Sequence, residues 1–343
     1  MFTYVLQRLL LLLPTFIGVT LIAFVVTHLA PGDPAELRAG GGLGAAGAEG
    51  LSTDRRSVVD QALAAWRARY GLDQPLPVQY WRWLRNLLTL EFGNSFKDSQ
   101  PVWGKIAERL PITIQLDVVS LVLMYAVAIP LGIYSATHPY SLGDQLTTFV
   151  AFLLFALPSY WIGTLAIVFL CGGDFFDLFP PGGMTSVGYS ASWPLGQRLL
   201  DRAWHLCLPV LVMSYGSFAA LSRFMRSSML ENIRQDYVQT ARAKGLAERW
   251  VIYKHVLRNS LIPIVTLMAS ILPSLISGSV IIETIFSIPG VGLLAYEAVL
   301  ARDYPIIMAV FTISSLLTLL SILLSDVLLT LVDPRITFSG RSA

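Results

Sequence analysis

The chain has 343 residues, of which 55% are apolar and 13% are charged. Ordinary soluble domains contain about 45–50% apolar and about 25% charged residues, so this composition excludes a typical soluble protein and favours a membrane protein. The net charge of +2 is too small for a nucleic-acid-binding surface.

The first predicted element is an apolar helix over residues 9–29. Its apolar run is longer than the roughly 7–15-residue core of a signal peptide. No small-x-small cleavage site follows, since the run ends in HLAPGDP at residues 28–34. We therefore expect residues 1–29 to form a retained first transmembrane helix.

Residues 30–111 form a predicted external segment with two short helices. The first has apolar residues at near-helical spacing and stops at Gly71; they are Val59, Leu63, Trp66 and Tyr70. The second begins at Pro77, and its apolar stripe consists of Tyr80, Leu84, Leu87 and Leu88, with Trp81 and Trp83 beside it. The aromatic residues favour a position at the outer headgroups, and mutual burial of the two stripes is the alternative.

Five further apolar stretches are long enough to cross a bilayer, whose hydrocarbon core needs about 20 helical residues. They lie at residues 112–136, 146–171, 205–223, 261–282 and 306–331. The sequence therefore predicts an all-α integral membrane protein with six transmembrane helices. Residues 112–331 form its five-helix core, and residues 332–343 form a tail. Prolines in these stretches predict kinked helices packed against neighbours that satisfy the freed backbone groups.

Basic residues predict the orientation, provided that only short loops are counted. The loop 224–260 holds Arg226, Arg234, Arg242, Lys244, Arg249, Lys254 and Arg258. The short loops on the opposite side hold only Arg198, Arg202 and Arg302. We therefore expect the loop 224–260 and both termini to face the cytoplasm.

Motifs for catalysis or metal binding are absent from the sequence. The only Gly-Lys pair, Gly104-Lys105, is followed by Ile106, so the chain has no phosphate-binding loop of the P-loop type. Its four histidines never form a His-Glu-x-x-His zinc motif. A nucleophile with a nearby base is not evident either. We expect a protein that is not an enzyme and that holds no metal or cofactor. The two cysteines, Cys171 and Cys207, flank one short loop and are either two free thiols or a disulfide.

The loop 228–260 is the most regular polar segment in the chain. Ile233, Tyr237 and Ala241 follow at four-residue steps and predict one helix from Ser228 that ends at Gly245. A second helix is predicted beyond the glycine and leads into the fifth span; its apolar residues are Ile252, Tyr253, Val256 and Leu257. Such a glycine-jointed, cationic knob can transmit a push from a soluble partner to the two spans it connects.

The sequence QTARAKG at residues 239–245 resembles the Glu-Ala-Ala-x-x-x-Gly coupling motif of ABC-importer permeases. Gln239 and Thr240 replace the Glu and the first Ala of that motif. The resemblance implies that the partner ATPases contact Gln239, Thr240, Ala241, Arg242, Lys244 and Gly245. The form TARAKG followed by HVLRN at 255–259 is similar to the dipeptide, oligopeptide and nickel branch of these permeases.

The resemblance extends over nearly the whole chain. It includes RYGLD at 69–73, EFGNS at 91–95, DYP at 303–305 and LVDPR at 331–335. Within the branch, GGDFFDLFP at 172–180 and the tail look most like the microcin C-type oligopeptide permease, as its B-type subunit. The resemblance implies the type I importer permease fold in a bacterial inner membrane. It implies as partners a second homologous permease, two ATPase subunits or domains that bind ATP and Mg²⁺, and an external peptide-binding protein. Dipeptides, oligopeptides, modified peptides and nickel complexes remain open as substrates.

Serines at helical spacing are candidates for lining the substrate path. They are Ser270, Ser274 and Ser277 in the fifth span and Ser214 and Ser217 in the fourth. Hydroxyl groups can hydrogen-bond a peptide backbone, but small residues also allow close helix packing, and both alternatives stay open. The rival function is a proton-coupled secondary transporter. It would need a midplane acid or histidine and usually an internal repeat, and neither is evident.

Overall fold

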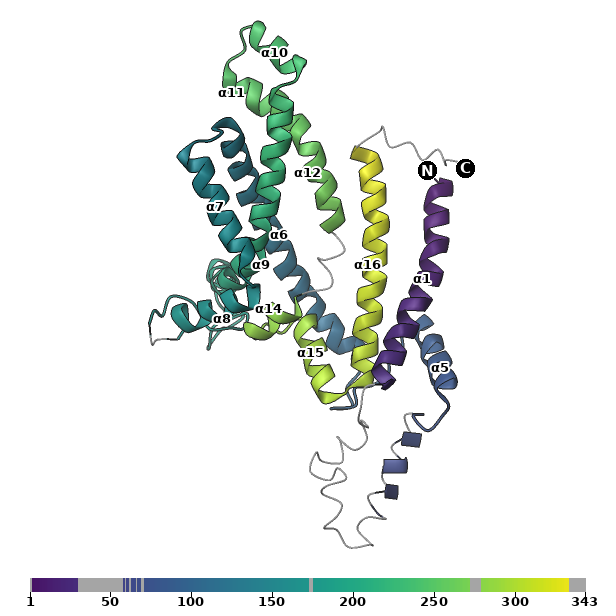
Figure 1. Cartoon of the computed structure of the whole chain (residues 1–343). Helices are drawn as coiled ribbons and strands as arrows, with labels where there is room; N and C mark the ends of the chain where they lie inside the picture. Colours follow the sequence, from purple (N-terminus) through teal and green to yellow (C-terminus); the bar gives the residue numbers. More distant parts are fainter. Residues whose placement is uncertain are drawn as a thin grey trace.

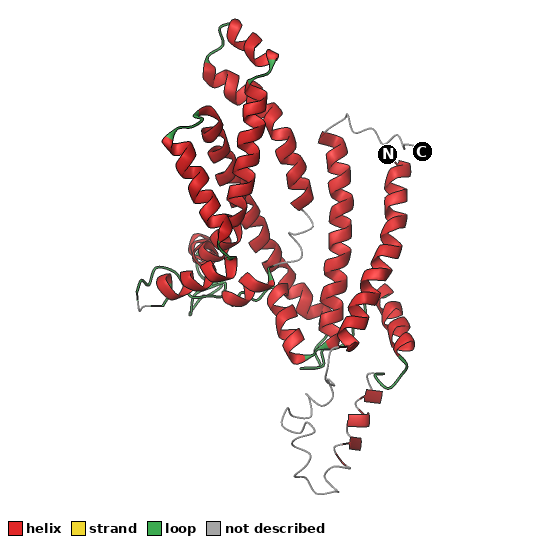
Figure 2. Ribbon diagram, in the orientation of Figure 1, coloured by secondary structure: helices red, strands yellow, loops and turns green. Residues whose placement is uncertain are grey.

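The structure is a computed structural model that describes residues 2–29, 58, 60–61, 63–65, 67–68, 71–172, 175–271 and 279–332. The described residues are helical or lie in turns, with only isolated bridges such as the one between Asn94 and Pro101 (Figure 2). An all-α membrane protein is therefore confirmed at this level.

Long helices dominate the arrangement in Figure 1. In chain order they are α1 (Phe2–Leu29), α5 (Leu76–Leu88), α6 (Val102–Thr137), α7 (Leu142–Ala156), α8 (Ser159–Leu170), α9 (Leu195–Ile233), α10 (Asp236–Ala243), α11 (Glu248–Trp250), the π-helix η1 (Val251–Val256), α12 (Leu257–Ile271), α14 (Val280–Ile285), α15 (Val291–Ala301) and α16 (Tyr304–Val332). The elements α10 and α11 lie at one end of the molecule, and α5 and α15 lie toward the other.

Four helices of the described chain are long and apolar enough to cross a membrane: α1, α6, α9 and α16. The helices α7 and α8 pass the same test only as a pair, bent by 96° at the break between them. The proline kink predicted for the span 146–171 is confirmed, and it is sharp enough to divide this stretch into two helices. Its cause is Pro158, which forces Leu157 before it into extended backbone (φ −90°, ψ 129°) and starts a new helix.

Two of the predicted spans are shorter than the helices that contain them. The span 112–136 lies inside α6, which begins at Val102, so the predicted border of the external segment at residue 111 falls within a helix. The span 205–223 lies inside α9, which runs from Leu195 to Ile233. A hydropathy window detects only the apolar part of a helix. These helices continue through polar turns beyond that apolar part. Of the predicted span 261–282, residues 272–278 lie outside the described chain.

Close contact between α6 and α9 forms the centre of the bundle. A Cβ added at Gly132 of α6 would lie 2.5 Å from Met225 Cβ and 2.7 Å from the Ser222 carbonyl oxygen of α9. Ser214 Oγ donates to the Ser120 carbonyl oxygen at 2.9 Å, which ties the same two helices together nearer their middle. Small residues and hydroxyl-to-backbone bonds are how membrane helices approach one another closely.

The helix α5 begins within one residue of the predicted Pro77. The Tyr80 hydroxyl lies 3.1 Å from Thr20 Oγ1 and 3.3 Å from the Ile17 carbonyl oxygen, so α5 lies beside α1 rather than only against another external helix. Residues 60–61, 63–65 and 67–68 of the predicted first external helix are helical, and Val59, Trp66 and Tyr70 lie outside the described residues.

Both cysteine thiols are free. Cys171 is buried, and Cys207 is partly buried. The disulfide alternative is therefore not realised in this structure.

Candidate functional site

The loop between α9 and α12 begins with a break that the sequence pattern did not predict. Instead of one helix from Ser228 to Gly245, α9 ends at Ile233 and α10 starts at Asp236. Gln235 between them has extended backbone (φ −74°, ψ 150°). The break turns α10 out of line with α9, and α10 and α11 together form the tip of the molecule in Figure 1.

The C-terminal end of α10 is fixed by Gly245, as predicted. Gly245 has a φ of +77°, a left-handed backbone conformation that residues other than glycine adopt only at a cost in free energy. The Gly245 N–H donates to the Arg242 carbonyl at 2.9 Å, and the Leu246 N–H donates to the Ala241 carbonyl at 3.4 Å. These two bonds form a Schellman motif, which satisfies carbonyl groups at the helix end.

A bidentate ion pair closes the tip. Arg242 Nε donates to Glu248 Oε2 at 3.1 Å, and Arg242 Nη2 donates to Glu248 Oε1 at 2.6 Å. The hydrogen bonds from Arg242 hold the pKa of Glu248 below its usual value, and the same bonds raise the pKa of Arg242. Because both side chains are exposed, solvent screens this pair, and we expect it to position α10 against α11 more than to stabilise the fold.

Apolar packing fastens the tip to the membrane-spanning helices. Val238 and Ala241 of α10 are buried against η1 and the end of α9, in one cluster with Val251, Val256 and Met229. The buried face of α10 therefore contains Val238 instead of the expected Tyr237, which is exposed. The break at Gln235 rotates the register by one position, and the four-residue pattern could not reveal it.

A chain of hydrogen bonds also joins α10, α9 and α12. The Tyr237 hydroxyl donates to Asn232 Oδ1, and Asn232 Nδ2 donates to the Ser228 carbonyl, each at 2.9 Å. Ser228 Oγ donates to the Ser260 carbonyl at 3.0 Å, and Ser260 Oγ shares its hydrogen between the Val256 carbonyl at 2.9 Å and the Ser228 carbonyl at 3.3 Å. This reciprocal pair, here called the serine clamp, fixes α9 to α12 just below the loop.

The predicted helix after Gly245 is divided into α11, η1 and α12. The middle part is a π-helix of six residues, Val251–Val256. A π-helix places one extra residue in a turn and occurs frequently at functional sites. It allows Val251, Ile252 and Val256 to be buried together beneath α10.

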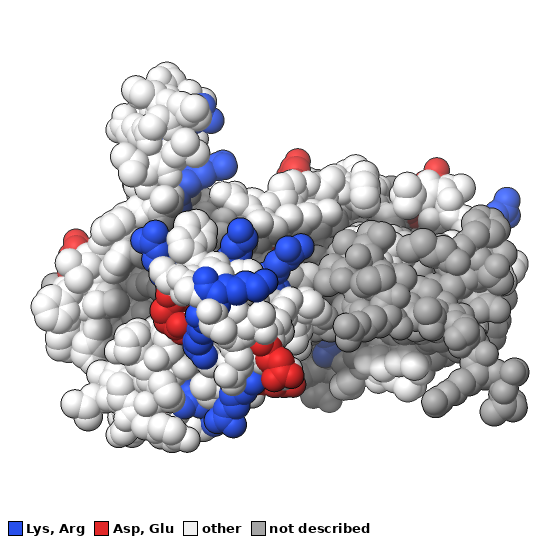
Figure 3. All heavy atoms as spheres, turned by 90° about the horizontal axis from the view of Figure 1, so that it is seen from above, with Lys and Arg blue, Asp and Glu red and all other residues white. Residues whose placement is uncertain are grey.

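The residues predicted to contact an ATPase lie together at the tip, and all of them except Ala241 are exposed. Gln239, Thr240, Arg242 and Lys244 are exposed on α10 and its C-terminal end, whereas Ala241 faces inward. Seen from this end, Lys and Arg side chains gather over the loop (Figure 3). Its exposed cations are Arg234, Arg242, Lys244, Arg249, Lys254 and Arg258.

A second ion pair lies next to this loop and was not predicted. Arg226 of α9 donates from Nε and Nη2 to the two carboxylate oxygens of Asp144, at 3.0 and 2.9 Å. Ser141 caps α7 by accepting from the Asp144 N–H at 3.2 Å. The sequence pattern Ser-x-x-Asp at 141–144 is a helix-capping signal and could have indicated the start of α7, but not its partner on α9.

The opposite end of the bundle is organised by a buried carboxylate, Glu283 of α14. The Thr113 hydroxyl donates to Glu283 Oε1, and the Leu293 N–H donates to Oε2, each at 2.9 Å. Thr113 Oγ1 in turn accepts from the Val291 N–H at 2.8 Å. Glu283 and Thr113 thus satisfy the free N–H groups at the start of α15, where a negative charge is favoured. Glycines at 290 and 292 leave the necessary room, because a Cβ at either would lie within 3 Å of Glu283.

Asp303 plays a similar part for the turn before α6. Its carboxylate accepts from the Ser95 hydroxyl, from the Phe96 N–H at 2.9 Å and from the Lys97 N–H at 3.3 Å. Asp303 is fully buried and lies just before α16. It therefore links two segments that are more than 200 residues apart in the sequence.

Comparison with known proteins decides the family. Residues 128–338 match the model of the binding-protein-dependent transport system inner membrane component, and residues 1–117 match the model of its N-terminal part. The chain belongs to this family of permeases. It is the transmembrane permease subunit of an ATP-binding cassette importer, and the secondary-transporter alternative has no support.

Relatives of this permease include peptide transport proteins. The oligopeptide transport system permease protein AppB of Bacillus subtilis is 38% identical over 98% of this chain and 100% of its own length. The inner membrane ABC transporter permease protein YejB of Escherichia coli O157:H7 is 36% identical, over 98% of this chain and 99% of its own. The dipeptide transport system permease protein DppB of E. coli K12 is 33% identical over the same shares.

The serines predicted to line a path in the permease are only partly described. Ser214 is buried, and its hydroxyl group bonds to the Ser120 and Val210 carbonyls, as the packing alternative predicts. Ser217 is partly buried. Ser274, Ser277 and the side chain of Ser270 lie outside the described residues. A path-lining role for these serines stays a prediction.

Proposed function

We propose that this permease moves peptides or peptide-like compounds across a bacterial inner membrane. Full-length similarity to oligopeptide and dipeptide permeases supports this substrate class. We propose six membrane spans, made by α1, α6, the bent pair α7–α8, α9, the stretch from α12 to α14, and α16. The concentration of cations at the α10 end supports a cytoplasmic position for that end and for both termini.

The proposed partners are a second homologous permease, two ATPase subunits or domains, and an external peptide-binding protein. ATP and Mg²⁺ would bind to the ATPases. The substrate path would run beside α9 and α12, where Ser214, Ser217, Ser270, Ser274 and Ser277 are candidates for hydrogen bonds to the peptide. Alternating access then follows from movement of the ATPases.

The loop at the α10 end is the proposed coupling site. One observation carries this proposal: an exposed cationic tip is joined without a flexible linker to α9 and α12, through a buried apolar base and the serine clamp. A force applied to Gln239, Thr240 or Lys244 therefore reaches two membrane-spanning helices directly.

Gly245→Val tests the coupling role. A β-branched residue disfavours the left-handed conformation at Gly245, at a cost of about 1–2 kcal/mol, and so displaces the tip. Peptide-stimulated ATP hydrolysis by the assembled importer should fall about tenfold. Gly188→Val is the matched control, because Gly188 also has a positive φ (+90°) and free space around it, but lies in the loop before α9.

Two results would contradict the proposal. Unchanged stimulation in Gly245→Val would show that the tip does not couple. An equal loss in Gly188→Val would show that backbone strain anywhere in the chain impairs the importer.

A further inference from the structure

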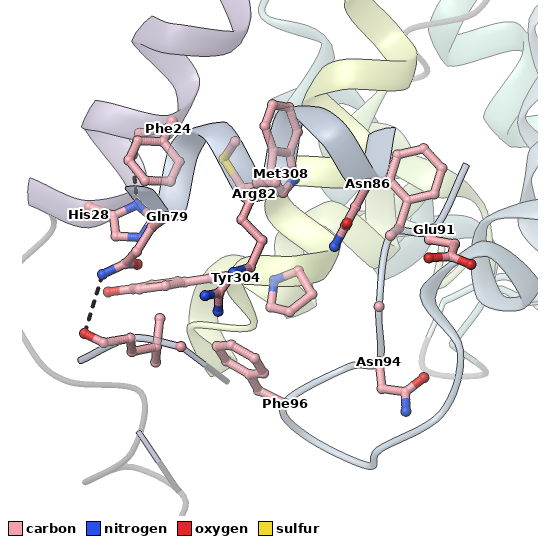
Figure 4. A pocket seen from close by; sticks show the side chains of 16 residues that line it. Phe24, His28, Gln79, Arg82, Asn86, Glu91, Asn94, Phe96, Tyr304 and Met308 are labelled. Atoms are coloured by element: carbon pink, nitrogen blue, oxygen red, sulfur yellow. Dashed lines mark hydrogen bonds between the residues drawn. The ribbon is translucent and has the colours of Figure 1, made fainter. Parts of the chain in front are cut away.

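A cavity of about 330 Å³ with both apolar and polar walls lies at the end of the molecule opposite α10, between α1, α5, α16 and the turn before α6. Figure 4 shows that its polar side chains come mainly from α5 and from the turn. They include Arg82, Asn86, Glu91 and Asn94. Aromatic rings and a thioether complete the wall, among them Phe24, Phe96, Tyr304 and Met308.

The cavity lies at the depth of a lipid headgroup and the adjoining acyl chains. The α1 residues that line the cavity are Phe24 and His28, which lie about 8 Å and about 2 Å along the helix from Leu29. The apolar part of α1, Leu9–Leu29, is about 31 Å long, which matches the hydrocarbon thickness of a bilayer. The part of α1 that lines the cavity therefore lies near the Leu29 end of this apolar stretch.

The surface of α5 also fits a membrane interface. None of its residues is buried, and its exposed residues include Trp81 at 69% and Leu88 at 83% of their full exposure. Tryptophan, tyrosine and arginine side chains with leucine are typical of helices that lie in the headgroup region. This exposed apolar surface needs lipid around it.

Two charged residues that line the cavity, Arg82 and Glu91, are exposed to solvent. Among the described residues, neither the Arg82 guanidinium nor the Glu91 carboxylate has an ion pair or a side-chain hydrogen bond. The Arg82 side chain passes close to Gly71. A Cβ at this position would lie 2.5 Å from Arg82 Nη1, so a larger residue would displace the guanidinium group. Gln79 differs, because its amide already donates to the Leu72 and Gln74 carbonyls.

We propose that this cavity binds the headgroup of a phospholipid that carries both a phosphate and a primary ammonium group. The Arg82 guanidinium suits a phosphate, with which it forms charge-assisted hydrogen bonds. The Glu91 carboxylate suits an ammonium group that donates hydrogen bonds. The amide groups of Asn86 and Asn94 supply further donors and acceptors, and Phe24 and Met308 meet the start of the acyl chains. A simple anion would be disfavoured by Glu91.

Lipid retention tests the proposal directly. The full chain is placed in bilayers of equal parts phosphatidylethanolamine, phosphatidylglycerol and phosphatidylcholine with identical acyl chains. It is then extracted in mild detergent, and the bound lipid is counted by native mass spectrometry. We expect phosphatidylethanolamine to be retained over the other two. Arg82→Gln and Glu91→Gln should each lower this retention about tenfold, the effect of losing one charge-assisted hydrogen bond.

Arg85→Gln is the matched control, since Arg85 is an exposed arginine of the same helix that does not line the cavity. Its retention should equal that of the unaltered chain. Size-exclusion profile and helix content establish folding, and Arg82→Lys, which keeps the positive charge, serves if Arg82→Gln does not fold.

Three outcomes would overturn the proposal. Equal retention in the Arg82, Glu91 and Arg85 variants would show that lipid binds elsewhere. A preference for phosphatidylglycerol that stays the same in the Glu91→Gln variant would show that the cavity attracts anionic lipids in general. Displacement of the retained lipid by dialanine would show that the cavity takes the charged ends of a peptide instead.

Discussion

At the end of the permease that carries α10, apolar side chains and the serine clamp hold an exposed, cationic tip. At the opposite end, Glu283 and Asp303 are buried and bond to backbone N–H groups of α15 and of the turn at 95–97. The difference follows from the backbone that each end contains. At the opposite end, N–H groups at the start of α15 and in the turn at 95–97 bond to buried carboxylates, whereas the start of α10 at the tip has no side-chain cap.

The tip is therefore held to α9 and α12 by apolar packing and by the hydrogen bonds described above, while the opposite end is fixed by bonds to buried carboxylates. Substitutions at the carboxylate end should affect stability, and substitutions at the tip should affect coupling. The following tests start with the largest expected effect.

Glu283→Ala should destabilise the permease most, by about 3–5 kcal/mol, because it leaves the Leu293 N–H unsatisfied and opens a cavity. Thermal unfolding in detergent measures the effect. Glu297→Ala is the control: this side chain is 44% exposed, and its ion pair with Arg109 is worth about 1 kcal/mol at most. Equal effects of the two substitutions would remove the distinction between the two ends.

Gly132→Ala should cost about 1–3 kcal/mol, because its methyl group would overlap Met225 and the Ser222 carbonyl where α6 meets α9. The matched control is Gly104→Ala in the same helix, which has free space around it and should be neutral or stabilising. Unfolding temperatures of both variants decide the point. No loss at Gly132 would mean that α6 and α9 are less tightly packed than this geometry requires.

The double variant Ser228→Ala with Ser260→Ala should cost only about 1 kcal/mol per hydroxyl group in stability. Peptide-stimulated ATP hydrolysis should nevertheless fall, since α9 and α12 are no longer fastened below the loop. Ser315→Ala removes a serine that bonds only within α16 and should leave the stimulation unchanged. If stability and stimulation fell in proportion, the serine clamp would be structural only.

Arg242→Gln should have the smallest effect on stability, about 0–1 kcal/mol. The pKa of Glu248 is lowered by Arg242, so this contribution is fully present above the normal pKa of a glutamate. It is lost as the pH falls through the lowered pKa of Glu248. Unfolding temperatures of the variant and the unaltered chain should therefore differ at neutral pH and converge in acid. If the difference between the two unfolding temperatures grew in acid, the ion pair between Arg242 and Glu248 would not be the source of the stability.

Much of the candidate site was predictable from the sequence. The left-handed Gly245, the cationic loop and the start of α5 near Pro77 all follow from local backbone preferences and from charge. The break at Gln235 and the π-helix were not predicted. Each replaces a stretch of regular helix by irregular backbone, and burial of residues such as Val238 offsets its cost in free energy. Helical periodicity in the sequence does not reveal which residues are buried in this way.

The sequence by itself determined that the chain is an all-helical membrane protein, because composition and long apolar runs act through the solvent and need no knowledge of neighbours. The tertiary structure alone decided which polar groups meet. Asp144 with Arg226, Thr113 with Glu283, and Ser95 with Asp303 are distant in sequence, and a hydrogen bond depends on distance and direction in space. The same holds for the cavity at Arg82 and Glu91, which three separate segments enclose.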